Sequence, residues 1–365
     1  MAEIKKMIVY LKNVLWQPLL AIVLGLLVGA GVIVVVGYNP VSIYITMFQK
    51  SFFTLHYLLQ SLTRSVPIIA CSLAIVAAWR AGYINLGVEG QMTFGAFAGT
   101  LVAVYMPGPT FLVVIVAAAC GMAAGALYAM FAAFIYDKFN VSIVISTLMM
   151  NYIATYITSY FINFPLRDTA NSYAIQTKEI PAAMHLPRIL PDKPFNLGFF
   201  LVIGLVIALM FVISKTKFGY ESKMTGLNPV FAQYGGVNKG RVMYATMALS
   251  GAIAAMAGML EIFGIKFRFA ESMFTSTSYA WTGLMAGLIS ALHPVGAFFT
   301  SIFLAGMQVG GQNIQLSTGI PVQVATLIQS TIMLFVSVHL FADFRKKRKR
   351  KALAASKKAG DGSWT

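Results

Sequence analysis

Polar residues interrupt an otherwise apolar part of the chain at residues 80–100, which read RAGYINLGVEGQMTFGAFAGT. Long apolar runs flank the interruption, at residues 66–79 and 94–106. The interrupting residues are Gly82, Asn85, Gly87, Glu89, Gly90 and Gln91. Irregular backbone at membrane depth is tolerated only where it is buried in protein or lines water. A carboxylate there is costly without a partner or water, so Glu89 indicates a functional site. The alternative is a cytoplasmic turn in which Glu89 stabilises the start of the next helix through the helix dipole.

The composition is that of a membrane protein. Hydrophobic residues make up 58% of the chain and charged residues 10%, and the mean hydropathy is +0.77. Soluble domains carry roughly 25% charged residues. We therefore predict an all-α, polytopic membrane protein with a single membrane domain, because the apolar runs leave no room for a separate soluble domain. The positive-inside rule explains the net charge of +16 better than nucleic-acid binding does.

Both ends of the chain are basic. Residues 1–17 precede the first apolar run, 18–37, whose length of roughly 20 residues suits an uncleaved membrane span. Residues 344–365 form a tail that opens with RKKRKRK, which suits an anchor on anionic lipid. A nucleic-acid-binding arm is the alternative for the tail. Cys71 and Cys120 lie in apolar runs, and we interpret them as packing residues rather than a disulfide or a metal site.

About ten spans are expected within a membrane domain at residues 18–343. They are residues 18–37, 61–79, 89–106, 110–136, 141–161, 197–214, 242–265, 279–292, 295–309 and 322–341. This count places both termini in the cytoplasm, together with the basic loops. Residues 39–60 are interpreted as an interfacial segment, and Asp137 with Lys138 as a short inner loop. Small residues recur at helical spacing at Ala117, Gly121, Gly125, Gly251 and Gly258, which predicts close helix packing.

Several polar side chains within the spans admit two interpretations. Arg64 either extends its charge toward the outer interface or contacts substrate. A row on the fifth span that includes Thr147 and Asn151 either joins helices by hydrogen bonds or lines a hydrated path. Residues 164–196 form a long outer loop, which is either a docking surface or a plain proline-rich connector.

The loop at residues 215–241 is too polar to span the membrane, and its lysines place it in the cytoplasm. Asn228 is a candidate helix cap, and Pro229 suits the first helical position. A short helix over residues 229–234 is therefore predicted, ending at Gly235 and Gly236. A helix that projects between two spans has no evident packing role, so it indicates a contact for a partner.

Three stretches together resemble a known family. They are GYINLGVEGQM at 82–92, FGYESKMTGLNPVFAQYGGV at 218–237 and HPVGAFFTSIFLAGMQVGG at 293–311. They resemble permease subunits of bacterial ABC importers of the simple-sugar and nucleoside group, from about residue 61 to residue 341. The first stretch is most similar to nucleoside (guanosine) permeases. The resemblance implies a multi-pass permease of the bacterial cytoplasmic membrane, with the ABC importer permease fold and no enzymatic activity of its own.

The resemblance also implies partners. In such permeases a coupling helix rests in a groove of a separate ATPase subunit, and the corresponding residues here are Gly226, Asn228, Pro229, Ala232, Tyr234 and Gly235. The family loop is usually closer to RAVGENP, from which Lys223, Met224, Thr225 and Leu227 depart. The chain has no GxxxxGK[ST] phosphate loop, so we expect the partner ATPase to use the ATP. We expect this chain to bind no cofactor, metal or nucleic acid. The other expected partners are a second permease, which we expect to be a paralogue rather than a copy, and an extracytoplasmic binding protein or lipoprotein.

Four residues are predicted to line the translocation path: Asn85, Glu89, Gln91 and Asn151. The substrate is expected to be a nucleoside, and a simple sugar such as ribose is the alternative. A less favoured alternative is an ion-driven secondary transporter, for which broken helices and a buried Glu would be suitable. It would require inverted repeats, which the sequence does not show convincingly. A non-transporting scaffold whose tail binds nucleic acid is a further alternative.

Overall fold

The computed structural model describes residues 23–318 except 36, 170–173 and 191, together with residues 323, 326–328, 330 and 331. The described part is helical, and its extended pairing is limited to two isolated bridges. The chain separates into two compact units, residues 49–309 and residues 1–48 with 310–365. In the second unit, a helix at Val23–Val35 precedes α2 (Pro40–Phe48).

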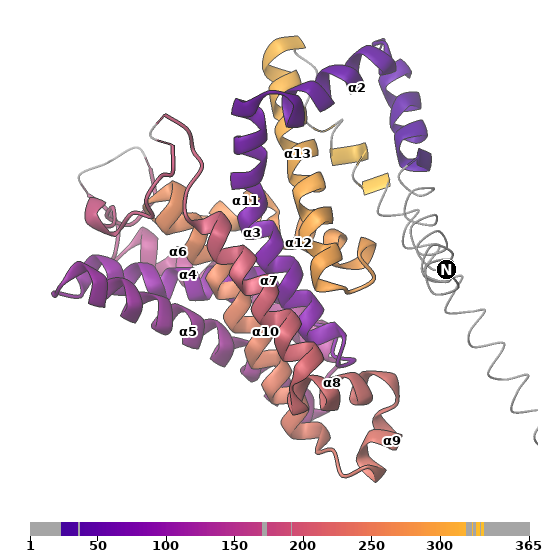
Figure 1. Ribbon diagram of the computed structural model, residues 1–365. Helices are drawn as coiled ribbons and strands as arrows, with labels where there is room; N and C mark the ends of the chain where they lie inside the picture. Colours follow the sequence, from indigo (N-terminus) through magenta and orange to yellow (C-terminus); the bar gives the residue numbers. More distant parts are fainter. Residues whose placement is uncertain are drawn as a thin grey trace, which may run out of the picture. The chain divides into compact units, whose positions relative to one another are not determined.

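The larger unit carries the candidate site. Its elements are η1 (Gln49–Phe53), α3 (Leu55–Trp79), α4 (Val88–Tyr105), α5 (Thr110–Phe139), α6 (Ile143–Asn163), η2 (Ala182–Met184), α7 (Gly198–Lys215), α8 (Lys217–Leu227), α9 (Pro229–Tyr234), α10 (Lys239–Glu261), η3 (Ile262–Lys266), α11 (Met273–Thr277), α12 (Tyr279–Ile289) and the first part of α13 (Pro294–Thr318). Figure 1 shows α3, α7 and α10 side by side, with α8 and α9 at one end of them.

Within the described residues, five helices are long and apolar enough to cross a membrane. They are Leu55–Trp79, Thr110–Phe139, Gly198–Lys215, Lys239–Lys266 and Pro294–Leu316. A sixth is obtained if Val23–Val35 and Pro40–Phe53 are counted as one broken span. The chain is thus an integral membrane protein by the length and composition of its helices. The predicted last span, at residues 322–341, and both basic ends lie outside the residues described continuously.

Several predicted boundaries were wrong. The helix α3 begins at Leu55, so it includes residues 55–60, which the sequence analysis had placed before the second span. Asp137 and Lys138 lie in the last turns of α5, and the chain turns only at Asn140, which has a left-handed backbone (φ 54°). Residues 217–227 form the helix α8, which the sequence analysis did not predict.

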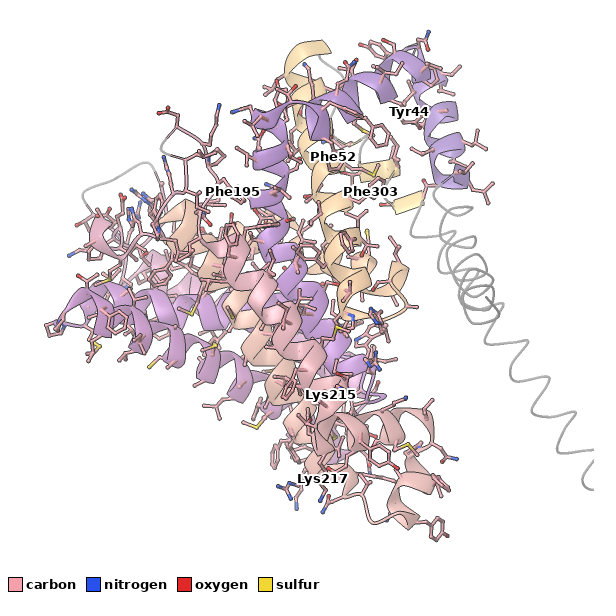
Figure 2. All side chains as sticks on the ribbon, viewed as in Figure 1. Tyr44, Phe52, Phe195, Lys215, Lys217 and Phe303 are labelled. Atoms are coloured by element: carbon pink, nitrogen blue, oxygen red, sulfur yellow. The ribbon has the colours of Figure 1, made fainter. Side chains whose placement is uncertain are left out.

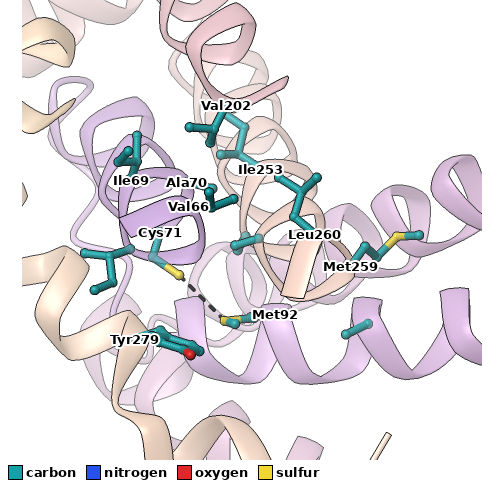
Figure 3. Packing of buried hydrophobic residues seen from close by; sticks show 14 of the residues in the cluster. Val66, Ile69, Ala70, Cys71, Met92, Val202, Ile253, Met259, Leu260 and Tyr279 are labelled. Carbon is teal, nitrogen blue, oxygen red and sulfur yellow. Dashed lines mark hydrogen bonds between the residues drawn. The ribbon is translucent and has the colours of Figure 1, made fainter. Parts of the chain in front are cut away.

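The central helix of the larger unit is α3, which is buried along most of its length between α7, α10 and α12. Cys71 on α3 contacts Met92 on α4, with 3.6 Å between the two sulfur atoms (Figure 3). The helix α10 packs against α4 and α5 through small residues, as the glycine rows predicted. A Cβ atom at Gly125 would lie 2.5 Å from the carbonyl oxygen of Gly251, so the two backbones are in direct contact.

The loop between α6 and α7 folds onto the segment that follows α10. The backbone N–H of Thr177 donates to the carbonyl of Phe269 (2.8 Å), and that of Ile180 donates to the carbonyl of Phe267 (2.8 Å). Arg268 forms an ion pair with Glu179. Phe195 lies just before α7, whereas Lys215 ends the helix and Lys217 follows it, so these side chains mark its opposite ends (Figure 2).

Candidate functional site

The segment between α3 and α4 folds back beside α3. After Trp79 the chain turns at Gly82, whose φ is +89°. The indole N–H of Trp79 then donates to the carbonyl of Asn85 (3.2 Å). Ser250 on α10 accepts a hydrogen bond from the Asn85 amide (2.9 Å) and donates to the carbonyl of Ala74 (2.7 Å). Because Ala74 lies roughly 7 Å inside the end of α3 at 1.5 Å per residue, Asn85 lies alongside that helix and not beyond it.

Asn85 and Gln91 form a reciprocal amide pair. The Asn85 Nδ2 donates to Gln91 Oε1 (2.9 Å), and the Gln91 Nε2 donates to Asn85 Oδ1 (3.0 Å). The same Asn85 oxygen accepts the backbone N–H of Gly87 (2.9 Å). Both side chains are buried, and the protein itself supplies their partners. Their geometry fixes the segment before α4.

Asn151 on α6 holds the segment from the other side. Its Oδ1 accepts the backbone N–H of Gly90 (2.8 Å), and its Nδ2 donates to the carbonyl of Leu86 (2.9 Å). Thr147, one turn earlier, accepts the N–H of Leu86 (3.1 Å). The polar row on α6 therefore joins helix to loop by hydrogen bonds. The structure brings together all four predicted path residues, but the side chains of Asn85, Gln91 and Asn151 are engaged by the protein.

We expect Asn85→Ala to destabilise the protein. The change removes partners from the Gln91 amide and from the backbone N–H of Gly87, both buried. Each buried group left without a partner costs about 1–3 kcal/mol. Thermal unfolding of the detergent-solubilised protein should therefore shift to a lower temperature. Ser214→Ala is the matched control, because the exposed Ser214 hydroxyl bonds only to a carbonyl of its own helix. Equal unfolding temperatures for the two variants would contradict this role of the network.

Glu89 differs from these three residues. It is 7% exposed, and its Oε1 accepts a hydrogen bond from the Thr275 hydroxyl on α11 (2.7 Å). No ion pair joins Glu89 to a basic residue in the part of the chain that the structure describes. The carboxylate lies on a narrow cleft of about 10 Å³, roughly the room that one water molecule needs. The cleft is lined by Ile75, Asn85, Leu86, Val88, Glu89, Ala280, Trp281 and Leu284.

A second buried polar cluster lies between α3, α10, α12 and α13. The Tyr279 hydroxyl donates to Glu261 Oε1 (3.0 Å), and the Arg64 guanidinium lies 5.0 Å from the Tyr279 ring centroid. Arg64 also donates to Gln308 Oε1 (3.2 Å), whose amide donates to the Thr282 hydroxyl (2.9 Å). Arg64 therefore has partners inside the protein. The sequence analysis missed this cluster because its members are far apart in the chain.

The predicted short helix is present as α9. The Asn228 side chain accepts the backbone N–H groups of Val230 (3.1 Å) and Phe231 (3.0 Å), and Pro229 occupies the first turn. The left-handed residue after the helix is Gly236 (φ +81°), whereas Gly235 has a negative φ of −78°. The helix is thus capped at both ends by its own residues.

The two faces of α9 differ. Ala232 is buried in a small apolar cluster with Ala81, Val237 and Val242. Phe231 and Tyr234 point the other way, and Tyr234 is 89% exposed. One face of α9 therefore packs on the turn that follows α3, and the opposite face offers aromatic surface to solvent or to a partner.

Gly226, at the end of α8, touches the same turn. A Cβ atom there would overlap the carbonyl oxygen of Arg80, and a Cβ atom at Gly82 would lie 3.4 Å from the Cα of Gly226. The Arg80 guanidinium donates to the carbonyl of Leu292 (3.3 Å), and its partial burial lowers its pKa from the ordinary value. The helix α8 is thus joined by backbone contact, and α9 by the apolar contact of Ala232, to the turn that leads to Asn85 and Glu89.

These features define a helical integral membrane protein in which the loop that carries α8 and α9 contacts a buried polar segment. Residues 57–337 match the family described as "Branched-chain amino acid transport system / permease component", and the chain belongs to that family. The family is one of transport permeases and not of enzymes.

Three relatives are similar over most of their length. The guanosine ABC transporter permease protein NupP of Bacillus subtilis is 30% identical over 321 residues, 88% of this chain and 92% of the relative. The nucleoside ABC transporter permease protein NupB of Lactococcus lactis is 27% identical, over 94% of this chain and 97% of the relative. The glucose ABC transporter permease protein TsgB13 of Haloferax volcanii is 29% identical, over 94% of this chain and 91% of the relative.

Proposed function

We propose that this chain is the permease subunit of an ABC importer and forms the translocation path for nucleosides. The observation that carries the proposal is the contact between α8, α9 and the turn at residues 80–82, which precedes the segment of Glu89. A cytoplasmic ATPase bound to the exposed face of α9 would thereby act directly on the polar segment. The similarity to guanosine and nucleoside permeases supports the choice of substrate.

The proposed arrangement is a multi-pass protein of the bacterial cytoplasmic membrane. It has about ten spans between residues 18 and 343, with basic cytoplasmic ends at 1–17 and 344–365. The basic loops agree with this orientation under the positive-inside rule. In it, residues 164–196 face outward and provide the docking surface for an extracytoplasmic binding protein or lipoprotein.

The chain works with three kinds of partner in this proposal. An ATPase subunit binds α9, uses the ATP and supplies the driving energy. A second permease, a paralogue rather than a copy, completes the path. The binding protein delivers the substrate. The chain itself holds no cofactor or metal in this scheme.

The six coupling residues have separate tasks in this mechanism. Asn228 and Pro229 start α9 and make it rigid, while Gly235 lies at its end. Tyr234 contacts the ATPase, whereas Ala232 and Gly226 contact the turn after α3. A displacement of α9 is therefore passed on to the backbone of residues 80–82. The turn at residues 80–82 is therefore the structural element that connects the ATPase contact at α9 with the translocation path.

Among the path residues, Glu89 is proposed to face the substrate. Asn85, Gln91 and Asn151 hold the segment that carries it, since their amides are bonded to one another, to Ser250 and to the loop backbone. These three side chains therefore contribute to the path by holding the segment that forms its wall in one position.

A simple sugar is the second candidate substrate, because the similarity to a glucose permease covers most of the chain. Uptake of labelled guanosine in cells with and without this gene tests the proposal, with unlabelled ribose and glucose as competitors. Gene-dependent uptake that neither sugar inhibits is the expected result. Inhibition by ribose or glucose would assign the sugar as substrate. Gene-dependent uptake that persists after loss of the ATPase subunit would favour an ion-driven transporter.

A further inference from the structure

Arg80 makes two separate contacts at the turn after α3. Its backbone carbonyl is the group that Gly226 of α8 touches. Its guanidinium donates to the carbonyl of Leu292 (3.3 Å). Leu292 belongs to the end of α12, because its own N–H donates to the carbonyl of Gly287 on that helix (2.9 Å). One residue therefore connects the loop that carries α8 and α9 with the end of α12.

The helix α12 is short, and the backbone breaks at each of its ends. Its 11 residues extend over roughly 16 Å, which is half the hydrocarbon thickness of roughly 30 Å. Ser278, before the helix, has a left-handed backbone (φ 53°), and so have Ala291 (φ 51°) and Leu292 (φ 61°) after it. This conformation is unfavourable for residues with side chains, and hinge motions take up backbone changes at the ends of such elements. The helix is thus a rigid segment between two positions suited to hinges.

The face of α12 that lies on α3 contains two glycines one turn apart. A Cβ atom at Gly283 would lie 2.7 Å from the Cβ of Cys71. A Cβ atom at Gly287 would lie 3.4 Å from the hydroxyl oxygen of Ser72, which has no hydrogen-bond partner among the described residues. Ser72 therefore does not bond α3 to α12 at this contact. Helices packed through such small residues shift past each other by small shear motions.

The same helix forms part of the cleft beside Glu89. Ala280, Trp281 and Leu284 of α12 line this cleft together with Glu89. With about 10 Å³, the cleft holds roughly one water molecule and is too narrow for a nucleoside. Passage of a nucleoside along Glu89 therefore requires one wall of the cleft to move. Of the described elements that line it, α12 is the short helix with a break at each end.

Hydrogen bonds hold the first turn of α12 in its present position. The Tyr279 hydroxyl donates to Glu261 on α10, and the Thr282 hydroxyl accepts from Gln308 on α13. Gln308 in turn accepts from Arg64 on α3. Because α12 is rigid, a displacement of its far end would also shift these bonds.

We infer that Arg80 is a positioning residue for transport, through which the ATPase moves α12. Movement of the turn at residues 80–82 displaces the end of α12 through the hydrogen bond from Arg80 to Leu292. The helix then shifts along α3 and widens the cleft beside Glu89. The inference rests on the proposed permease function and supplies the step between the turn and the path.

The first experiment measures the number of guanosine molecules transported per ATP hydrolysed. The purified importer, with its ATPase, second permease and binding protein, is reconstituted in proteoliposomes with Arg80→Met or Arg80→Lys. Methionine has no donor, whereas lysine retains a charged one. We expect Arg80→Met to lower this number by roughly tenfold, as for a lost charge-assisted hydrogen bond, and Arg80→Lys to restore part of it. Arg241→Met, at an exposed position in the first turn of α10, is the matched control and should keep the wild-type number.

A cross-link tests whether α12 moves. Ser72→Cys and Gly287→Cys together place two thiols within reach of a disulfide, since a Cβ atom at Gly287 would lie 3.4 Å from the Ser72 oxygen. Oxidation of the double variant should lower guanosine uptake by roughly tenfold or more, because a locked gate prevents each cycle, and reduction should restore uptake. Each single variant should respond to the oxidant as the wild type does, and Gly287→Cys alone also controls for pairing with Cys71. Mass spectrometry measures the fraction of disulfide formed.

The outcomes separate this inference from the function on which it rests. If the wild-type importer shows no ATP-dependent guanosine uptake, the proposed function fails. If the wild type transports guanosine and Arg80→Met keeps the number of guanosine molecules per ATP, the inference is refuted, even where uptake and hydrolysis fall together, because equal losses indicate a structural role. Undiminished uptake by the disulfide-linked protein refutes the movement of α12. Failure of the disulfide to form contradicts the contact between α12 and α3 on which the inference depends.

Discussion

Replacing Gly251 with valine is expected to abolish folding of the membrane domain. A Cβ atom at Gly251 would overlap the carbonyl oxygen of Gly125 and would lie 2.6 Å from the Cβ of Ala129. Both atoms belong to α5, and a backbone carbonyl cannot rotate away as a long side chain can. Because helix association in lipid depends on close packing, α5 and α10 would have to separate. Overpacking alone costs typically about 1–3 kcal/mol, and a lost helix contact more.

The measurement is the amount of monodisperse protein recovered from membranes. Gly204→Val on α7 is the control, since a Cβ atom at Gly204 meets nothing within 4 Å. We expect Gly251→Val to fall to roughly a tenth of the wild type or less, because a few kcal/mol of destabilisation changes abundance several-fold. Equal recovery of the two valine variants would show that the α5–α10 contact is not required.

The sequence predicted those elements whose cause is local. The helix α9 was predicted with its observed bounds, since its cap Asn228, its Pro229 and the glycines after it all act within a few residues. The glycine row of α10 likewise predicted close packing, because small side chains have the same effect whichever helix they meet. Neither prediction required knowledge of the tertiary structure.

The helix α8 was missed for a tertiary reason. Its sequence, KFGYESKMTGL, contains two glycines and no apolar stripe. The structure explains both glycines. A Cβ atom at Gly226 would overlap the carbonyl oxygen of Arg80, and a Cβ atom at Gly219 would overlap the carbonyl oxygens of Val212 and Ile213 at the end of α7. Gly219 permits α8 to start directly against α7. A residue that weakens the helix locally is therefore what permits it to pack.

The candidate site was predicted in part. Asn85, Glu89 and Gln91 are neighbours in sequence, so their common environment follows from chain continuity. Trp281 and Thr275 come from α12 and α11, almost two hundred residues later, and no spacing rule joins them to Glu89. Nothing in the sequence indicated that Asn85 and Gln91 bond to each other while Glu89 bonds to Thr275.

Replacing Gly226 with valine is expected to uncouple transport from ATP hydrolysis while the protein still folds. Valine at this position would collide with the Arg80 carbonyl and push α8 away from the turn at residues 80–82. The exposed face of α9, including Tyr234, would remain intact. The ATPase should therefore still bind, but its movement would no longer reach the segment of Asn85 and Glu89. We expect guanosine uptake to fall by roughly tenfold or more, which corresponds to about 1.4 kcal/mol.

Three measurements on one membrane preparation decide this prediction: uptake, co-purification of the ATPase subunit, and ATP hydrolysis by the purified complex. Gly204→Val is again the control, and Tyr234→Ala supplies the contrasting defect, in which the ATPase should no longer co-purify. Loss of the ATPase from Gly226→Val would instead place Gly226 in the docking surface. Wild-type uptake in Gly226→Val would contradict the role of the turn. In this mechanism the contact between α8 and Arg80 connects the ATPase-binding helix α9 with the polar segment of Asn85 and Glu89.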